Sequence, residues 1–285
     1  MEKLKRIAAI HDLSGLGKCS LTVALPVISA SGVECSCIPT AVLSTHTGGF
    51  QGYTLKDLND EMLPIARHWS TVGAEFDGVY SGYLASPQQA IVVRQIIDLL
   101  SKDDTKVIVD PVMADNGEYY SNLGEDMCCA FRELCGIAHV ITPNITEAAL
   151  LCDMEYKSVH EESYIQGLMK CLSDICPGHV VITGVATVDG RLGNAALDRV
   201  SGEVLYDMGP ARKGLFYGVG DLFASSLSAL LVRGATLRQA LRAASALVRE
   251  SVRRTELRGA PRIFGAEFET ALPGYIQSLR EIFED

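Results

Sequence analysis

The chain has 285 residues, of which 48% are hydrophobic and 21% are charged, and its formal net charge is −10. This length and apolar content allow one large α/β domain, and we expect residues 1–285 to form it. The acidic balance argues against a broad nucleic-acid surface, and no stretch approaches the roughly 20 apolar residues of a membrane helix. We therefore expect no nucleic-acid or membrane partner, and the lack of a signal-peptide pattern predicts a cytoplasmic location.

The nine cysteines predict free thiols rather than disulfides or a metal site. Their number is odd, the chain is long, and no Cys-x-x-Cys spacing occurs. Cys35 and Cys37 would share one face of a strand, but two sulfurs without further ligands make a weak site. We therefore expect buried or half-buried thiols in a reducing compartment.

Apolar runs and helical periodicity alternate through the first half of the chain. They predict strands at 4–10, 33–39, 78–80 and 106–109, and helices at 20–31, 58–69, 87–100 and 123–135. Pro64 predicts a kink in the second helix, and Pro87 opens the third helix at a position that proline favours. Strands that alternate with helices in this way are typical of a parallel sheet.

The second half extends this pattern. It predicts strands at 139–142 and 180–183, helices at 145–151, 158–174, 222–231 and 237–254, and an antiparallel ribbon at 192–197 and 202–208. The last helix is rich in arginine, which we interpret as a solvent-exposed face. The whole pattern predicts a three-layer α/β fold with a mostly parallel central sheet flanked by helices. In such a sheet, ligands bind at the edge where the carboxyl ends of the strands meet.

A glycine turn, Gly218-Val219-Gly220-Asp221, directly precedes the apolar helix at 222–231. Unpaired N–H groups at a helix N-terminus attract anions, and glycines let an anion approach the backbone. A carboxylate beside an anion site is unfavourable unless it has a task, such as accepting the proton of an attacking hydroxyl. The alternative is an ordinary N-cap aspartate, and the turn alone does not decide between the two.

Three oxygen-bearing side chains follow neighbouring predicted strands. Asp110 ends the strand at 106–109, and Asn144 and Glu147 follow the next strand along the chain. Such oxygens suit Mg²⁺ held partly through water, although Asp110 could be a turn former and the other two a helix capping box. Together with Asp221, they favour a metal–phosphate centre for phosphoryl transfer. The chain has no P-loop motif.

Five motifs in order give the chain a resemblance to a known family. They are STHTG at 44–48, SGYL at 81–84, DPVM at 110–113, TPNITE at 142–147 and GVGDLFA at 218–224. With these motifs the chain resembles the pyridoxal/pyridoxamine kinases, a branch of the ribokinase-like superfamily, from residue 7 to about residue 248. The resemblance implies a ribokinase-like fold and a homodimer. It also implies ATP-dependent phosphorylation of the 5′-hydroxyl of pyridoxal, pyridoxamine or pyridoxine.

The resemblance also implies roles for residues of the catalytic turn. Asp221 matches the general base, which also contacts the vitamin. Gly218, Val219 and Gly220 match the anion hole that receives the transferring phosphoryl group. The family implies ATP and Mg²⁺ as cofactors, and it leaves a monovalent cation such as K⁺ open.

Further positions match the nucleotide and vitamin sites of the family. Asp110 and Glu147 match residues near Mg²⁺, bound directly or through water, and near the ATP phosphates. Further ATP-site positions are Thr142, Asn144 and Thr183. Thr47 and Tyr83 match positions that line the vitamin pocket.

Two departures from the family pattern concern both substrates. Asp12 stands where many of these kinases have a serine that contacts the pyridine ring, which predicts a preference for a cationic ring or for an amine. Arg212 and Lys213 precede the glycine turn in a segment that borders ATP in the family. They either reach the triphosphate or are exposed loop charges. His46 is expected to be a hydrogen-bonded structural histidine rather than a proton shuttle.

Three alternatives remain for the function. A hydroxymethylpyrimidine kinase shares the fold, but Asp221 and the loop at 45–47 favour the vitamin B6 branch. A sugar kinase carries a longer lid after the first strands, whereas the segment between Val33 and Gly78 looks mostly helical. A catalytically silent ligand-binding relative would not need Asp221, Asp110 and Glu147 together.

Overall fold

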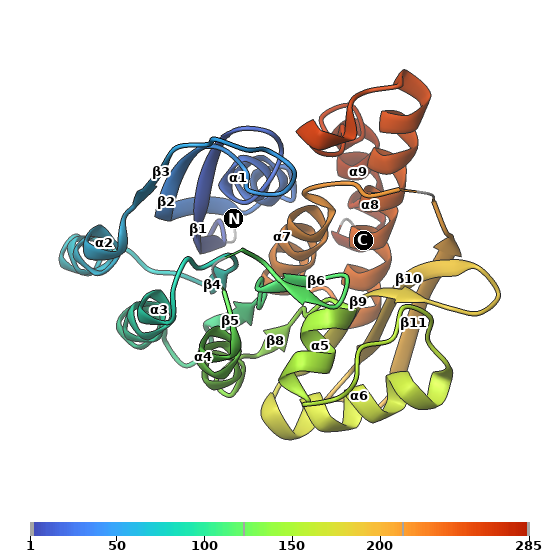
Figure 1. Ribbon diagram of the computed structural model, residues 1–285. Helices are drawn as coiled ribbons and strands as arrows, with labels where there is room; N and C mark the ends of the chain where they lie inside the picture. Colours follow the sequence, from blue (N-terminus) through green and yellow to red (C-terminus); the bar gives the residue numbers. More distant parts are fainter. Residues whose placement is uncertain (1–2, 122, 213, 284–285) are drawn as a thin grey trace.

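A computed structural model describes residues 3–121, 123–212 and 214–283. Within these residues a nine-stranded sheet runs through the molecule (Figure 1). Its strands, in spatial order, are β11 (Val204–Pro210), β10 (Arg191–Leu197), β9 (His179–Ala186), β8 (Val140–Ile141), β5 (Lys106–Val109), β4 (Gly78–Ser81), β1 (Arg6–Leu16), β2 (Glu34–Thr45) and β3 (Leu55–Asp57). The strands from β9 to β2 pair in parallel, and the outer pairings β9–β10, β10–β11 and β2–β3 are antiparallel.

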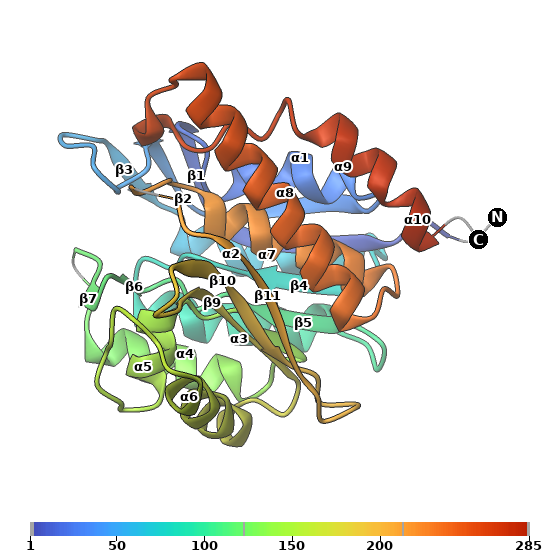
Figure 2. The ribbon, with the colours of Figure 1, turned by 90° about the vertical axis from the view of Figure 1, so that its right-hand side faces the viewer.

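Helices cover both faces of this sheet (Figures 1 and 2). One layer holds α2 (Asn59–Thr71), α3 (Pro87–Leu100), α4 (Glu125–Cys135), α5 (Ile145–Leu151) and α6 (Glu162–Ile175). The other holds α1 (Leu21–Ala30), α7 (Val219–Val232), α8 (Leu237–Arg258) and α9 (Leu272–Ser278), followed by the short α10 (Arg280–Phe283). The expected three-layer α/β fold with a mostly parallel sheet is confirmed.

Central strands are apolar without interruption because both of their faces are buried. In β1, Ile7 and Ala9 belong to the core under α1 and α7, whereas Ala8 and Ile10 belong to the core under α3 to α6. This alternation assigns each residue of a central strand to one of two cores. The same alternation decides which polar side chains at the strand ends share a face.

The expectation that residues 33–78 are mostly helical is wrong. β1 continues past a register shift between His11 and Leu13 as far as Leu16, and β2 runs to Thr45 beside it. β3 then pairs with β2 antiparallel. Polar and glycine residues in 11–16 look like a loop in sequence, but pairing with the neighbouring strand β2 holds them extended. These three strands project beyond the carboxyl edge of the sheet (Figure 2).

Several helices begin at capping residues visible in the sequence. Ser86 accepts a hydrogen bond from the Gln89 amide ahead of Pro87, and Thr236 forms a capping box with Gln239. α8 ends at Gly259, whose φ is +62°. The predicted helix ends lie within two residues of the observed ones, with three exceptions. α7 begins three residues before Leu222, α8 runs four residues beyond Arg254, and α6 begins four residues after Ser158. The hairpin of β6 (Ala114–Asp115) and β7 (Glu118–Tyr119) was not predicted.

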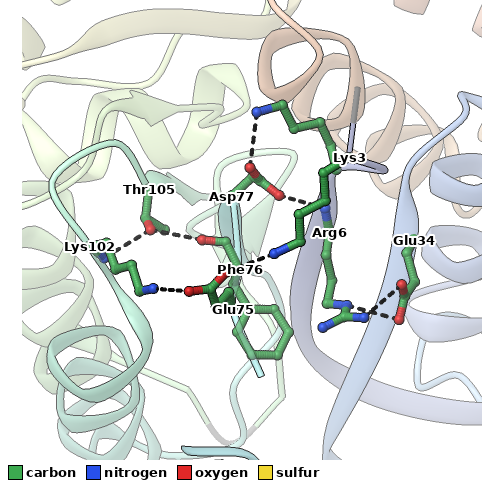
Figure 3. A network of polar contacts seen from close by, with 9 residues as sticks. Lys3, Arg6, Glu34, Glu75, Phe76, Asp77, Lys102 and Thr105 are labelled. Atoms are coloured by element: carbon green, nitrogen blue, oxygen red, sulfur yellow. Dashed lines mark hydrogen bonds and ion pairs between the residues drawn. The ribbon is translucent and has the colours of Figure 1, made fainter. Parts of the chain in front are cut away.

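An ionic network holds the amino ends of β1 and β4 together (Figure 3). Lys3 and Lys102 both contact the Glu75 carboxylate, and the Arg6 backbone amide donates to Asp77 at 2.9 Å. The Lys3, Lys102 and Glu75 side chains are exposed by half or more, so each of these ion pairs contributes little stability. These ion pairs lie at the amino edge of the sheet, so they do not occupy the carboxyl edge where a ligand would bind.

All nine cysteines are free thiols, as expected, and all except the exposed Cys129 are buried or half-buried. No helix in the described part of the chain combines the length and apolar character needed to cross a membrane.

Candidate active site at the carboxyl edge of the sheet

The glycine turn starts helix α7. Gly218 is the N-cap residue, with φ of +72° in the left-handed region. A Cβ there would lie 1.8 Å from the Lys18 carbonyl oxygen, so only glycine fits. Val219, Gly220 and Asp221 form the first turn, where free amides and the helix dipole favour an anion. Because Gly218 occupies the N-cap, the interpretation of Asp221 as an ordinary N-cap is wrong.

The surroundings of Asp221 disfavour the charged form of its carboxyl. Burial raises the pKa of its carboxyl to about 7, the backbone amide of Ser20 opposes this shift as a hydrogen-bond donor, and the charge of Asp12 adds to it. A carboxyl with this pKa exchanges a proton readily near neutral pH, as a general base must.

Asp110 faces Asp221 from the end of β5. Its carboxyl is almost fully buried, and its Oδ1 accepts a 2.9 Å hydrogen bond from the Thr142 hydroxyl at the end of β8. Burial raises the pKa of Asp110 to about 8, and repulsion from Asp221 adds to the shift. The two carboxylates therefore form an electrostatically strained pair.

Asn144 and Glu147 form a capping box at the start of α5, so the capping interpretation is confirmed. Glu147 Oε2 accepts the Asn144 amide at 2.8 Å, and Oε1 accepts the Met113 amide at 3.1 Å. The Asn144 side chain also donates to the Ala114 carbonyl oxygen at 2.7 Å. These bonds fasten the β6–β7 hairpin to α5. Burial, followed by the charge of Asp110, nevertheless raises the pKa of Glu147.

The donor set fits Mg²⁺ held mainly by phosphate and water rather than by a protein cage. Thr142 engages only one oxygen of Asp110, whereas backbone amides engage both oxygens of Glu147. Among the described residues, no three His, Cys, Asp or Glu side chains are arranged to hold a metal ion. Mg²⁺ tolerates such a site because it keeps several waters and binds one or two carboxylates beside substrate phosphates.

Asp12 lies close enough to both Tyr83 and Asp221 for its charge to raise the pKa of each. Asp12 is 4% exposed and accepts a 2.9 Å hydrogen bond from Ser14. Burial raises its pKa. Burial and then the Asp12 charge raise the pKa of Tyr83 to about 12. Thr47 is half-buried in the loop that follows β2.

His46 has the structural role expected of it. Its Nε2 lies 2.6 Å from the Ile263 carbonyl oxygen, and its ring packs against Phe50 and Tyr217. The bond joins the loop after β2 to the C-terminal segment. Nearby, Lys18 contacts Gly265, where a Cβ would lie 2.7 Å from the Lys18 Cβ.

The remaining predicted ATP-site residues lie along the same edge or beside it. Thr183 donates its backbone amide to Pro143 at 2.9 Å, which puts it next to the start of α5. Arg212 pairs with Glu256 of α8 at 2.7 Å and is exposed, which favours the loop-charge alternative. Lys213 lies outside the described residues.

Comparison with known proteins assigns the family. A family model described as phosphomethylpyrimidine kinase matches residues 23–261. The chain belongs to this family. A pyridoxine/pyridoxal/pyridoxamine kinase of Bordetella avium is 30% identical over 267 residues, covering 88% of this chain and 86% of that protein. The resemblance to pyridoxal kinases is confirmed, and the chain is a kinase-family phosphotransferase.

Two further similar proteins are described by names that point to thiamine biosynthesis and to pyridoxal. The thiamine biosynthetic bifunctional enzyme TH1 of Arabidopsis thaliana is 28% identical over 229 residues, or 79% of this chain, but the match spans only 42% of that enzyme. A crystallised protein of Bacteroides thetaiotaomicron, described as a phosphomethylpyrimidine kinase and solved with pyridoxal, has a TM-score of 0.90 and 34% identity. That comparison covers 99% of this chain and 98% of the other.

Sequence reasoning missed several groups of this candidate site. Ser20 contributes a backbone amide to Asp221, and Cys19 lies close enough for Asp221 and Asp12 to raise its pKa beyond the effect of burial. Burial raises the pKa of the Tyr120 phenol, and the charges of Glu147, Asp221 and Asp110 add to this shift. The position of Ser20 before an apolar helix is visible in the sequence, but nothing in the sequence predicts its φ of +53°.

Two surface hollows of about 380 and 370 Å³ lie elsewhere in the kinase, around α4 to α6. They share Arg132 and Asp153, which form an ion pair at 2.9 Å. Neither hollow is lined by Asp110, Glu147 or Asp221. We therefore place the candidate active site at the carboxyl edge of the sheet, where these three carboxylates lie.

Proposed function

We propose that this protein transfers the γ-phosphoryl group of ATP to the 5′-hydroxyl of a vitamin B6 vitamer. One observation carries the proposal: a carboxyl with a pKa of about 7 lies in the first turn of α7, at a glycine turn whose amides favour an anion. Phosphoryl transfer needs both parts at one point, a base for the acceptor hydroxyl and donors for the transferring group. The B6-kinase relative and the pyridoxal-bound neighbour support the choice of acceptor.

In this proposal Asp221 accepts the proton of the 5′-hydroxyl while the oxygen of that hydroxyl attacks the γ-phosphorus of ATP, and ADP leaves. Gly218, Val219 and Gly220 supply the amides that stabilise the charge on the transferring phosphoryl oxygens. The Ser20 amide keeps the Asp221 carboxylate oriented. Because this base is buried only in part, the acceptor hydroxyl can reach it.

The nucleotide phosphates would lie over the ends of β5, β8 and β9. Asp110 would hold Mg²⁺ with its free oxygen, while Glu147 orders the surrounding backbone and Thr142 and Thr183 flank the phosphates. Bound Mg²⁺ neutralises phosphate charge. Its positive charge would also offset the repulsion between Asp110 and Asp221, which burial makes strong.

The function is tested by mixing the protein with Mg·ATP and each of pyridoxal, pyridoxamine, pyridoxine and hydroxymethylpyrimidine, and measuring ADP release. Turnover with at least one vitamer that exceeds turnover with hydroxymethylpyrimidine is expected. Turnover with hydroxymethylpyrimidine alone contradicts the proposal, and binding without turnover favours a silent relative.

Hydroxymethylpyrimidine kinase is the second candidate. The family model and the thiamine-biosynthetic relative favour it. Asp12 distinguishes the two substrates by chemistry, because a buried carboxylate beside a pyridine ring favours a protonated ring nitrogen or a nearby ammonium group.

Asp12→Ser is expected to change vitamer preference. With the carboxylate removed, the ratio of kcat/KM for pyridoxamine to that for pyridoxal should fall about tenfold, equivalent to about 1.4 kcal/mol of lost differential binding. Steady-state kinetics with both vitamers measure the ratio. Ser173→Ala, on the exposed side of α6, is the control. An unchanged ratio contradicts the role of Asp12.

A further inference from the structure

Two cysteines from neighbouring helices line the same surface hollow. Cys152 is the C-cap residue of α5 and Cys171 lies within α6, and these two helices pack against each other (Figure 1). Both thiols are half-buried, and both line the hollow of about 380 Å³ beside α6. A small molecule in this hollow can therefore reach either sulfur. The pair lies outside the candidate active site, so phosphoryl transfer gives it no task.

The backbone of α6 places the two sulfurs close together. The Cys152 Sγ lies 3.8 Å from the Leu168 carbonyl oxygen, to which its thiol donates a weak hydrogen bond. In an α-helix a carbonyl points toward the C-terminus, and residues three positions apart are neighbours on the helix surface. Cys171 follows Leu168 by three positions, so its side chain lies beside the oxygen that Cys152 contacts. Two different elements thus bring their thiols to one part of the hollow.

The surroundings of Cys152 hold its thiol in the protonated form. Burial raises the pKa of this thiol, and its hydrogen-bonding contact with Cys171 adds to the shift. The charge of Arg132 opposes the shift, whereas that of Asp153 adds to it. A protonated thiol is a poor nucleophile. Of the two cysteines, Cys171 is therefore the one that attacks an oxidant first.

We propose that Cys152 and Cys171 are a redox-active thiol pair that a hydroperoxide converts into a disulfide. The Cys171 thiolate attacks the hydroxyl oxygen of the peroxide, so an S–O bond forms, the O–O bond breaks, and the leaving oxygen takes up a proton. The Cys152 sulfur then attacks the sulfenic acid of Cys171. The S–S bond forms, the S–O bond breaks, and water leaves with the Cys152 proton. The two thiols lose two electrons, which reduce the peroxide, and exchange with a small thiol reverses the step.

The disulfide would fasten α5 to α6. α5 begins at the capping box of Asn144 and Glu147 and ends at Cys152, so the bond would hold the far end of a helix that starts in the candidate active site. It would also close a loop of residues 153–170. Closing such a loop removes conformational freedom from the unfolded chain, so the Tm of the oxidised protein should rise by about 5 °C.

Peptide mapping of the full-length protein tests this pair without any substrate. The reduced protein is treated with a small molar excess of hydrogen peroxide, the remaining thiols are alkylated, and the chain is digested without reductant. Cys152 and Cys171 should be recovered mainly as one linked pair of peptides, and the intact mass should fall by that of two hydrogen atoms. Dithiothreitol should restore both thiols and the original Tm.

Single variants separate the roles of the two thiols. In Cys152→Ser, Cys171 should accumulate as a sulfenic acid that dimedone traps, whereas in Cys171→Ser the Cys152 thiol should stay unmodified. Cys129→Ser, at an exposed position of α4, is the matched control and should leave the yield of the linked pair unchanged. Recovery of Cys152 and Cys171 unlinked, or linked to other cysteines, in the oxidised wild type overturns the proposal. An oxidised protein whose Tm does not rise overturns the fastening of α5 to α6.

Discussion

Replacing Asp221 with asparagine is expected to lower kcat about 1,000-fold while Mg·ATP binding persists. Asparagine keeps the size of the side chain but cannot accept the proton of the attacking hydroxyl, and a general base contributes roughly 10²- to 10⁴-fold. The amides of the glycine turn stay in place, because Gly218 rather than Asp221 caps the helix. Steady-state ADP release measures kcat, and calorimetry with Mg·ATP measures binding.

Asp98→Asn is the matched control for this experiment. Asp98 is exposed on α3, where it pairs with Arg94 within the same helix, so its loss should leave both measurements unchanged. A loss of turnover for Asp221→Asn of no more than about tenfold, or ~1.4 kcal/mol, would show that the base is a different group.

Asp110→Asn is expected to produce a protein that is more stable but much less active. The pKa of Asp110 is about 8 in the folded chain against a usual value of 3.8. Between these values the folded state binds a proton that the unfolded state has lost, so stability falls as pH rises through this window. Each such group contributes a slope of up to about 1.4 kcal/mol per pH unit.

Thermal unfolding from about pH 5 to pH 8.5 measures this effect. In the protein without nucleotide, Asp110→Asn should flatten the decline of stability with pH and raise Tm most at the alkaline end. Asp221 shares the pattern with a pKa of about 7, so part of the slope should remain. Asp98→Asn should follow the wild-type curve, and a parallel curve for Asp110→Asn would show that its carboxyl is not strained.

The sequence was most informative about polar residues that directly follow the strands of the parallel sheet. Asp110, Asn144 and Glu147 follow apolar strands, and a parallel sheet brings such positions to one edge whatever the details of packing. That rule predicted their proximity to one another. It did not predict the particular bonds, because the Thr142–Asp110 contact depends on which face each side chain takes.

The sequence was least informative where a residue depends on distant backbone. The extended conformation of 11–16 comes from pairing with β2, not from local preference. Ser20 holds a positive φ that no neighbouring residue specifies. Tyr80 looked like an ordinary core residue of a short strand, because sequence shows apolar character but not an unpartnered hydroxyl.

The close packing around Lys18 has a consequence for how the site is assembled during folding. The Lys18 carbonyl contacts Gly218, its side chain contacts Gly265, and its amide donates to the Phe264 carbonyl oxygen at 3.1 Å. Two segments that lie 200 or more residues further along the chain thus meet at Lys18. Contacts of such long sequence separation form late, since loop closure must precede them. We therefore expect a folding chain to form its central strands before the glycine turn at 218–221 is fixed, because that turn packs on Lys18, which residues 264–265 also contact.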